Sequence, residues 1–255
     1  MITFPLLGYW GRLGNQMFQY AALMGFAKKH DYQYGICFNH SNVYGGFSIH
    51  KERLQLLDCF ELSCEDTKGG LHETTLEEIP VDYDLPDNVN LHGYYQSEKY
   101  FKHIENEIRQ EFFFKKEIRE KAAAILPQNV CVSVHVRRGD YVNLSHIHTN
   151  LGAEYYKNSL DHFEGYTPVF ISDDIDWCKD EFSNVQDAVF VESESEYVDM
   201  CVMTMCNAHV IANSSFSWWG SWLGQGETIA PKQWFTGEQG PTEWEDVYCE
   251  GWIRK

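Results

Sequence analysis

The second half of the chain alternates short apolar runs with segments of helical spacing, and this alternation limits the fold more than any other feature. The apolar, β-rich runs lie at 130–136, 167–172, 187–191, 208–213 and 227–231. The helical segments between them lie at 152–163, 174–182, 196–207 and 216–224. Strands that alternate with helices form parallel β-α-β units, and strands that are apolar along their whole length belong to a sheet covered on both faces. We therefore predict a doubly wound α/β domain in this half.

The first half starts with the same pattern and then becomes irregular. A strand is predicted at 2–8, a helix at 16–30 and a second strand at 34–38. The residues that follow, up to about position 90, are rich in Gly, Asp, Asn and Glu and show no clear periodicity. A further helix is predicted at 114–126, where Pro127 ends it.

The composition narrows the classes of ligand. The chain has 38 acidic and 20 basic side chains and a formal net charge of −18, which repels nucleic acid and anionic lipid. We therefore expect no nucleic-acid partner, and an anionic ligand needs a local basic site. With 255 residues, of which 44% are hydrophobic, the chain can form two domains of similar size, 1–127 and 128–255.

The cysteines and the N-terminus bear on the cellular compartment. Eight cysteines are scattered without C-x-x-C or zinc-type spacing, so we expect small buried residues rather than disulfides or metal ligands. The N-terminal apolar run is too short to span a bilayer, and no charged segment precedes it. We expect neither a signal peptide nor a membrane anchor, and a cytoplasmic location.

Polar side chains follow the strands of the second half at the points where those strands end. In an open parallel sheet, ligands bind beyond the carboxyl ends of the strands. The side chains that this rule brings to one edge are Arg137, Arg138, Asp140, Ser172, Asp173, Asp174, Glu192, Asn213, Ser214, Ser215 and Ser217.

The basic and hydroxyl groups of this set suit an anionic ligand. The guanidinium forks of the two arginines match phosphate oxygens, and Asp140 can hold one of them from behind. The serines of NSSFSWWG lie where a helix begins, so their hydroxyls and the free N–H groups there also suit an anion. Two structural alternatives stay open: HVRRGDYV can be a charged turn that ends a strand, and the serines can cap the helix.

The loop GRLGNQ in the first half also joins a strand to a helix. Its spacing of Gly8, Gly11 and Gly14 fits neither the dinucleotide fingerprint nor a Walker loop, which disfavours NAD and ATP as ligands. Glycine permits close approach of the backbone there, and Asn15 or Gln16 can hydrogen-bond a ligand.

Six blocks of the sequence, taken together, resemble the signature blocks of a known family. The blocks are GRLGNQMFQYA, GYYQSEKYF, HVRRGDY, FISDDIDW, ANSSFSWWGSWL and APKQWF. In this order they resemble the α-1,2-fucosyltransferases of glycosyltransferase family 11, from residue 8 to about 235. The resemblance implies a GT-B-type architecture, with two Rossmann-like doubly wound domains that face each other across a cleft. Residues 1–127 would form the acceptor-side domain and 128–255 the GDP-fucose-binding domain.

The resemblance also implies a reaction and its partners. The reaction is an inverting transfer of L-fucose from GDP-β-L-fucose to the 2-hydroxyl of a terminal galactose on a glycan, without a metal or a cofactor. The partners would be GDP-fucose and a galactose-terminated glycan, while the oligomeric state stays undefined. Two alternatives stay open: another GT-B fucosyltransferase with a different linkage or acceptor, and a non-catalytic module that binds a nucleotide-sugar.

The same resemblance assigns roles to individual residues. His135 would orient the guanine or ribose, and Arg137 with Arg138 would hold the diphosphate. Asp173 would contact the nucleoside. The other donor-binding candidates are Gly14, Asn15, Gln16, Asn213, Ser214, Ser215 and Ser217. The acceptor-binding candidates are Tyr94, Gln96 and Glu98.

The chemistry of the transfer fits these residue types. Cleavage of the bond between fucose C1 and GDP leaves negative charge on the diphosphate, which preorganised donors stabilise. We therefore expect Arg138 and Asp140 to be catalytic. The acceptor hydroxyl needs a base, for which Glu98, Asp140 and His92 are candidates, or its proton passes late to a phosphate oxygen.

Two further patterns are more simply structural. D-x-D pairs at 82–84 and 174–176 match the pattern with which many glycosyltransferases hold a metal, but 38 carboxylates make chance matches common, so we expect no metal site. The aromatic residues of the last helical segment have helical spacing and are expected to pack against the sheet; they are Phe216, Trp218, Trp219 and Trp222.

Overall fold

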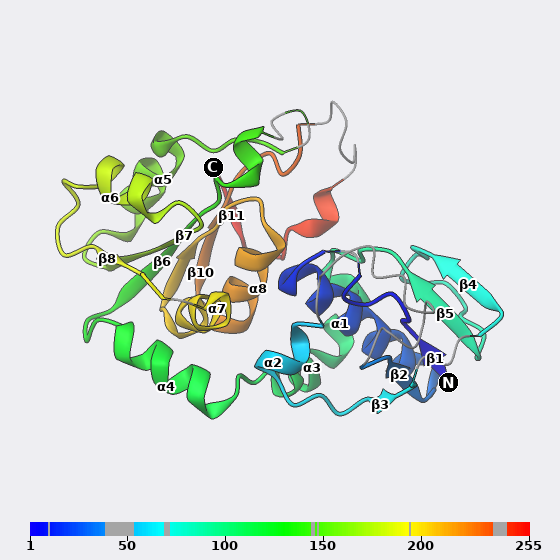
Figure 1. Cartoon of the computed structure of the whole chain (residues 1–255). Helices are drawn as coiled ribbons and strands as arrows, with labels where there is room; N and C mark the ends of the chain where they lie inside the picture. Colours follow the sequence, from blue (N-terminus) through cyan, green and yellow to red (C-terminus); the bar gives the residue numbers. More distant parts are fainter. Residues whose placement is uncertain are drawn as a thin grey trace. The chain divides into compact units, whose positions relative to one another are not determined.

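The computed structural model describes residues 1–9, 11–38, 54–68, 72–143, 146, 148–193, 195–236 and 244–255. These residues form two compact units, Met1–Lys115 and Lys116–Lys255 (Figure 1). The division lies before the expected 127/128 boundary, because helix α4 (Lys116–Ile125) packs against α7 (Glu196–Met205) of the second unit. The helix predicted at 114–126 is thus confirmed, but it belongs to the second unit.

The second unit contains a parallel six-stranded sheet in the order β11-β10-β9-β6-β7-β8. Its strands are β6 (Cys131–Val136), β7 (Thr167–Ser172), β8 (Val189–Phe190), β9 (Ala208–Val210), β10 (Glu227–Ala230) and β11 (Ile253–Arg254). When the six strands are numbered 1 to 6 in chain order, so that β6 is strand 1, and the sheet is read from its β8 edge, the order is 3-2-1-4-5-6. This is the strand order of the Rossmann fold. The five strands predicted here are confirmed, and β11 is an additional edge strand.

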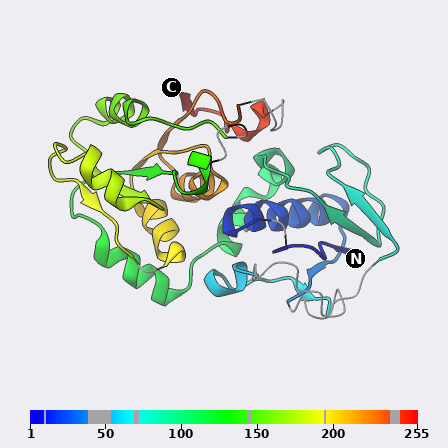
Figure 2. The same cartoon turned by 45° about the horizontal axis from the view of Figure 1, so that its top comes forward.

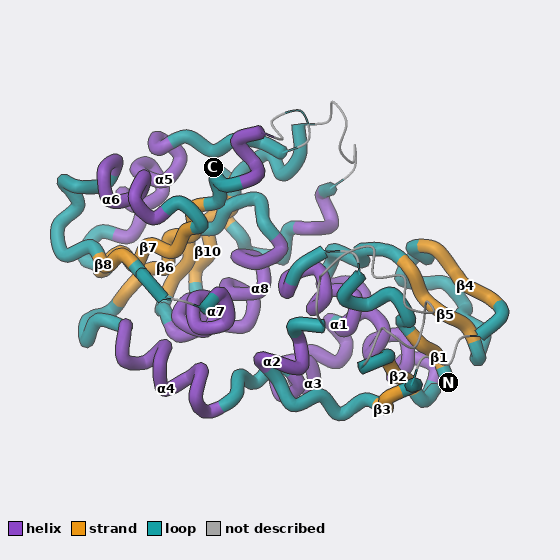
Figure 3. Tube along the Cα trace, in the orientation of Figure 1, coloured by secondary structure: helices purple, strands orange, loops and turns teal. Residues whose placement is uncertain are grey.

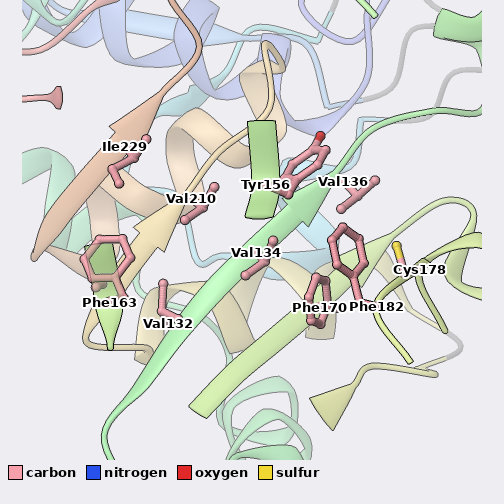
Figure 4. Close-up of a cluster of buried hydrophobic side chains, with 11 residues drawn as sticks. Val132, Val134, Val136, Tyr156, Phe163, Phe170, Cys178, Phe182, Val210 and Ile229 are labelled. Atoms are coloured by element: carbon pink, nitrogen blue, oxygen red, sulfur yellow. The ribbon is translucent and has the colours of Figure 1, made fainter. Parts of the chain in front are cut away.

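Helices cover both faces of this sheet, as Figure 1 shows. Besides α4 and α7 they are α5 (Ala153–Leu160), α6 (Ile175–Glu181) and α8 (Ser215–Gly224), with 3-10 turns η4 (Asp140–Asn143), η5 (Asp161–Phe163) and η6 (Glu245–Val247). On one face, Val132 and Val134 of β6 lie in the same apolar cluster as Tyr156 of α5 and Phe182 beside α6 (Figure 4). This confirms the doubly wound arrangement that the alternating pattern predicts.

The alternate residues of β6 point to the opposite face, because side chains of a strand alternate between faces. There the Ser133 hydroxyl lies 2.8 Å from Nδ1 of His209 in β9. The ring of His135 lies 5.3 Å from that of Phe216 in α8. Every residue of β6 is buried, so this strand is the centre of the unit.

The tryptophans of α8 form part of the core, as expected. Trp218 and Trp219 have no exposed surface, and their rings pack edge to face at 4.9 Å. The indole N–H of Trp218 donates to the Val247 carbonyl at 2.6 Å. This contact ties η6 to the helix.

The first unit contains a parallel five-stranded sheet in the order β3-β2-β1-β5-β4 (Figure 3). Its strands are β1 (Ile2–Thr3), β2 (Tyr34–Ile36), β3 (Glu65–Asp66), β4 (Thr74–Glu77) and β5 (Val89–His92). Its helices are α1 (Leu13–His30), α2 (Leu56–Cys59) and α3 (Glu105–Glu111), with 3-10 turns η2 (Glu98–Tyr100) and η3 (Lys102–Ile104). The first two predicted strands are confirmed in shortened form, and the other three strands were not predicted.

Helix α1 organises the first unit, and Figure 2 shows it along its length. It is buried over most of its residues and carries its basic side chains only in the last turn. Phe26 contacts Tyr95 at 6.2 Å and Tyr100 at 5.7 Å between ring centroids, while Phe18 contacts Phe101 at 6.4 Å. The segment that follows β5 is therefore fixed against α1 by aromatic packing.

All eight cysteines are free thiols, and all except Cys64 are buried, as the sequence pattern predicted. Within the described residues, no helix has both the length and the apolar character needed to cross a membrane.

Candidate functional site

The sheet of the second unit has a topological switch point between β6 and β9, which are neighbours in the sheet although strands β7 and β8 come between them in sequence. Ligands of open α/β sheets bind beyond the carboxyl ends of the strands at such a point. Arg137 and Arg138 follow β6, and Asn213 and Ser214 come shortly after β9. The topology therefore brings these predicted residues to the same edge of the sheet.

Arg137 is held at both ends of its guanidinium group. Nη1 lies 2.7 Å from the Asp173 carboxylate, and Nη2 lies 2.6 Å from that of Asp140. The guanidinium also lies 5.1 Å from the centre of the Tyr141 ring, and the side chain is only 17% exposed. The expectation that Asp140 fixes one arginine is confirmed, and that arginine is Arg137.

Arg138 is held differently. Its Nε donates to Asp174 Oδ2 at 3.1 Å, and its guanidinium carbon lies 4.1 Å from the centre of the Trp177 ring. Among the residues that the structure describes, neither terminal nitrogen of Arg138 has a partner. An oriented guanidinium with two unused donor groups at the edge of a sheet can bind phosphate oxygens in a bidentate manner.

Asp173 contacts the segment that carries both arginines, residues 137–140, which we call the arginine loop. Its Oδ1 accepts from the backbone N–H of Arg138 at 2.9 Å and of Gly139 at 3.3 Å, while Oδ2 pairs with Arg137. The carboxylate is therefore engaged by the protein itself. A contact between Asp173 and a nucleoside, as the resemblance implies, stays a prediction.

Two predicted donor-binding residues are committed to the fold. The amide of Asn213 is 2% exposed and donates to the carbonyls of Thr149 at 3.1 Å and Trp234 at 2.8 Å. The hydroxyl of Ser217 has no exposed surface and donates to the carbonyls of Ala212 at 3.0 Å and Ser214 at 3.2 Å. These side chains hold loops in place, and a contact of either one with the donor stays a prediction.

The other two serines lie at the start of α8. Ser214 is the N-cap, with its hydroxyl oxygen accepting from the Phe216 N–H at 3.3 Å, so the capping alternative holds for this residue. Ser215 is half-buried at the first helical position. Of these serines, Ser215 is therefore the best placed to donate to an anion at the helix terminus.

His135 lies on β6, next to the arginine loop. Burial and, to a smaller extent, the nearby positive charge of Arg137 together lower the pKa of His135 to about 3. The imidazole is therefore neutral at physiological pH. Its Nδ1 is buried without a hydrogen-bond partner among the described residues, so a hydrogen-bonding group of a ligand can still pair with the ring.

In the first unit, the predicted residues of the glycine loop and of the segment after β5 meet at the β1–β5 edge. Gln96 Nε2 donates to Asn15 Oδ1 at 2.9 Å. Gly11 has a φ of +91°, and a Cβ there would lie 2.3 Å from Asn15 Nδ2, so only glycine lets Asn15 adopt this position. Tyr94 is exposed beside this pair. The two sets of residues therefore form one polar surface within the first unit.

Other predicted residues of the first unit have structural partners. Gln16 is fully buried, donates to the Gly11 carbonyl at 3.3 Å and accepts from the Gln55 N–H at 2.8 Å, so its assignment as a donor contact stays a prediction. Gly14 is buried in the first turn of α1. Glu98 pairs with Lys102 at 3.1 Å.

The two D-x-D pairs have different environments. Asp174 caps α6 and pairs with Arg138, whereas Asp176 is 92% exposed and lies 3.8 Å from Lys179. Asp82 and Asp84 are exposed. In the described ranges, no three His, Cys, Asp or Glu side chains are grouped as metal ligands would be.

Sequence reasoning missed two aromatic residues of the site. Trp177 comes three residues after Asp174, which caps α6. A cap residue followed by tryptophan in the first helical turn could have indicated that this ring lies beside the site. Tyr141 stacks on His148 at 3.9 Å and donates to the Asn213 carbonyl at 3.2 Å. These contacts join Tyr141 to residues that lie 7 and 72 positions further along the sequence, so no local pattern indicates them.

The fold and the arginine site together define a class of protein. Two units with parallel sheets, one in Rossmann order and with basic residues at its switch point, are typical of nucleotide-binding proteins of the GT-B type. The structure of fucosyltransferase NodZ from Bradyrhizobium has this fold, with a TM-score of 0.57 and 12% sequence identity over 86% of this chain and 91% of that chain. The structure of NodZ alpha-1,6-fucosyltransferase soaked with GDP-fucose gives a TM-score of 0.56 at 14% identity, over 87% and 91% of the chains.

The sequence comparison is more specific. The chain belongs to glycosyltransferase family 11, because residues 7–255 match Glycosyl transferase family 11. It is 32% identical to an alpha-1,2-colitosyltransferase of Escherichia coli over 96% of both chains. It is 31% identical to galactoside alpha-(1,2)-fucosyltransferase 2 of Oryctolagus cuniculus over 88% of this chain and 70% of that protein. The resemblance seen in the six motif blocks is thereby confirmed at the level of the family.

Proposed function

We propose that this glycosyltransferase moves L-fucose from GDP-β-L-fucose to the 2-hydroxyl of a terminal galactose on a glycan, with inversion at the anomeric carbon. The observation that carries the proposal is Arg138, whose guanidinium is oriented by Asp174 and Trp177 while its terminal nitrogens are unused among the described residues. Membership of family 11 and the names of the relatives support the choice of sugar and linkage.

The proposed mechanism relies on charge that develops as the sugar leaves. When the bond between C1 and the diphosphate breaks, the leaving group gains negative charge and the fucosyl group becomes positive. Arg138 donates to the diphosphate oxygens from a fixed position, so little reorganisation is needed at the moment of reaction. Ser215, together with the N–H groups at the start of α8, adds weaker donors for the same anion. Other glycosyltransferases use a metal to stabilise the charge on the diphosphate. We propose that these groups stabilise it here and that the reaction needs no metal.

Neutral His135 would recognise the nucleoside side of the donor. Its low pKa keeps the ring uncharged, so it can accept a hydrogen bond from a ribose hydroxyl or a base N–H without repelling Arg137. On the acceptor side, Gln96 and exposed Tyr94 offer the amide and aromatic surface that sugars bind, and Asn15, which accepts from Gln96, would contact the donor. The acceptor proton passes to Asp140, Glu98 or His92, or late in the reaction to a phosphate oxygen.

A second donor deserves a direct test because of the colitosyltransferase relative, which matches 96% of this chain. Colitose is fucose without its 3-hydroxyl, and a site built to hydrogen-bond that hydroxyl discriminates strongly against a sugar that lacks it. Purified protein is given GDP-fucose and GDP-colitose separately, each with lactose, and GDP release is followed. We expect transfer with kcat/KM at least tenfold higher for GDP-fucose. The reverse preference would replace fucose by colitose, and binding of GDP-fucose without turnover on any galactoside would favour the non-catalytic module.

A further inference from the structure

We propose that Asp173 is a positioning residue: its carboxylate fixes the arginine loop in the geometry in which the loop binds the donor diphosphate. The proposal rests on the proposed function, because it concerns the same anion site. It differs from the contact with the nucleoside that the family resemblance implies for this residue.

Backbone and side-chain groups converge on this one carboxylate. Oδ1 accepts from two successive backbone N–H groups, those of Arg138 at 2.9 Å and Gly139 at 3.3 Å. Oδ2 lies 2.7 Å from Nη1 of Arg137. A single side chain thus fixes both the backbone of the arginine loop and the guanidinium of one of its arginines, across 35 positions of sequence.

These contacts contribute little to holding the domain together. The side chain of Asp173 is 28% exposed and lies at the surface edge of the sheet. Ion pairs that water still reaches contribute little to stability. Three convergent contacts at such a position therefore act mainly on the local geometry of the loop.

A glycine of the arginine loop lies opposite this carboxylate. A Cβ at position 139 would lie 2.4 Å from Oδ2 of Asp173, closer than real Cβ contacts come. The backbone of Gly139 is not in the left-handed region, so its conformation is one that other residues adopt. Glycine at position 139 therefore leaves the space in which the Asp173 carboxylate reaches the backbone of the loop.

The test uses full-length protein with changes on both sides of this contact. Asp173→Asn keeps the size of the side chain but removes the charge that faces Arg137. Gly139→Ala adds a methyl group that displaces the carboxylate. Asp176→Asn is the matched control, because it removes one carboxylate three residues along and is 92% exposed, with Lys179 as its ion-pair partner.

Two readouts separate positioning from a general structural role. Hydrogen–deuterium exchange of the peptide that covers residues 137–140 reports the order of the loop without any ligand. Titration with GDP, pyrophosphate and guanosine then shows which part of the donor is affected. Melting temperature serves as the control for folding.

We expect Asp173→Asn and Gly139→Ala each to speed hydrogen–deuterium exchange in the arginine loop and to weaken the binding of GDP and pyrophosphate. Transfer should fall about 10²-fold, because a small misplacement of a binding group has an effect of this size. Guanosine binding and the melting temperature should stay near those of the wild type, and Asp176→Asn should behave like the wild type throughout. The double variant should be no worse than either single variant, because both changes break the same contact.

Three outcomes would overturn the proposal. Unchanged loop exchange in folded Asp173→Asn would show that the carboxylate does not order the loop. Weakened guanosine binding with unchanged pyrophosphate binding would assign Asp173 to the nucleoside. Additive losses in the double variant would mean that the two residues act separately. If the wild type fails to transfer fucose, the proposed function fails, while the exchange and pyrophosphate measurements still decide the role of Asp173.

Discussion

Replacement of Arg138 by alanine should abolish most transfer while leaving the fold nearly intact. The side chain is 27% exposed and its ion pair with Asp174 involves a carboxylate that is 40% exposed, so the pair contributes about 0.2–1 kcal/mol to stability. Its contact with the Trp177 ring at 4.1 Å adds about 0.5–1 kcal/mol at an exposed site. Together these losses lower the melting temperature by roughly 1–8 °C.

The expected effect on catalysis is larger. Loss of one preorganised donor to a developing anion typically costs about 10²–10³ in rate, or roughly 2.7–4 kcal/mol. GDP release in the presence of GDP-fucose and lactose measures this loss, with circular dichroism and thermal unfolding as checks of the fold. Arg138→Lys should recover only part of the activity, because an ammonium group cannot reproduce the bidentate fork.

Arg254 provides a matched control for this experiment. It also has one ion pair, with Glu245 at 2.6 Å, and one aromatic contact, with Tyr248 at 4.5 Å, but it lies on edge strand β11. Arg254→Ala should therefore destabilise the protein to a similar extent without loss of transfer. A folded Arg138→Ala protein with turnover within threefold of the wild type, or an equal loss in Arg254→Ala, would refute the reasoning.

Three further predictions follow from the site and the core. Ser217→Ala should lower the free energy of unfolding by about 1 kcal/mol with little change in the KM for GDP-fucose, because the Ser217 hydroxyl donates to backbone carbonyls. Ser215→Ala should do the opposite: it should raise the KM for GDP-fucose at unchanged stability. Transfer should continue in excess EDTA, and loss of turnover that Mg²⁺ or Mn²⁺ restores would require a metal-bound diphosphate. Burial lowers the pKa of His209 from 6.5 to about 4, so the unfolded state takes up a proton first as the pH drops. The contribution of His209 to stability should therefore fall by roughly 3 kcal/mol between pH 6.5 and 4, in addition to the fall that buried His135 causes. Denaturant titrations should show a shallower fall in His209→Gln than in the wild type.

The fold of the second unit could be predicted from sequence because its central strands are buried on both faces. Such strands, β6 above all, are apolar throughout and stand out between helical segments. In the first unit, β3 and β4 were missed because their residues are largely exposed and so show no apolar pattern. The boundary between the units was set too late because the packing of α4 on α7 joins segments far apart in sequence.

The sequence predicted which residues gather at one edge of the sheet, but not which of them pair with each other and which keep groups that can bind a ligand. The rule for strand ends brought the arginines, Asp173 and the serines to one edge, yet it gives no information on which polar groups pair with each other. Two carboxylates occupy Arg137, and loop carbonyls occupy Asn213. These partners come from distant loops, so only the three-dimensional structure distinguishes Arg138, which has unused donors in the described part of the chain, from its neighbour.

The product of the reaction tests the central proposal most directly. The protein is incubated with GDP-β-L-fucose and lactose, and the trisaccharide is characterised by NMR. The proposal predicts an α-fucoside on the 2-hydroxyl of galactose, because attack on C1 from the face opposite GDP inverts the β-linked donor. A β-fucoside would contradict the inverting mechanism, and an α-fucoside on another hydroxyl would contradict the α-1,2 assignment.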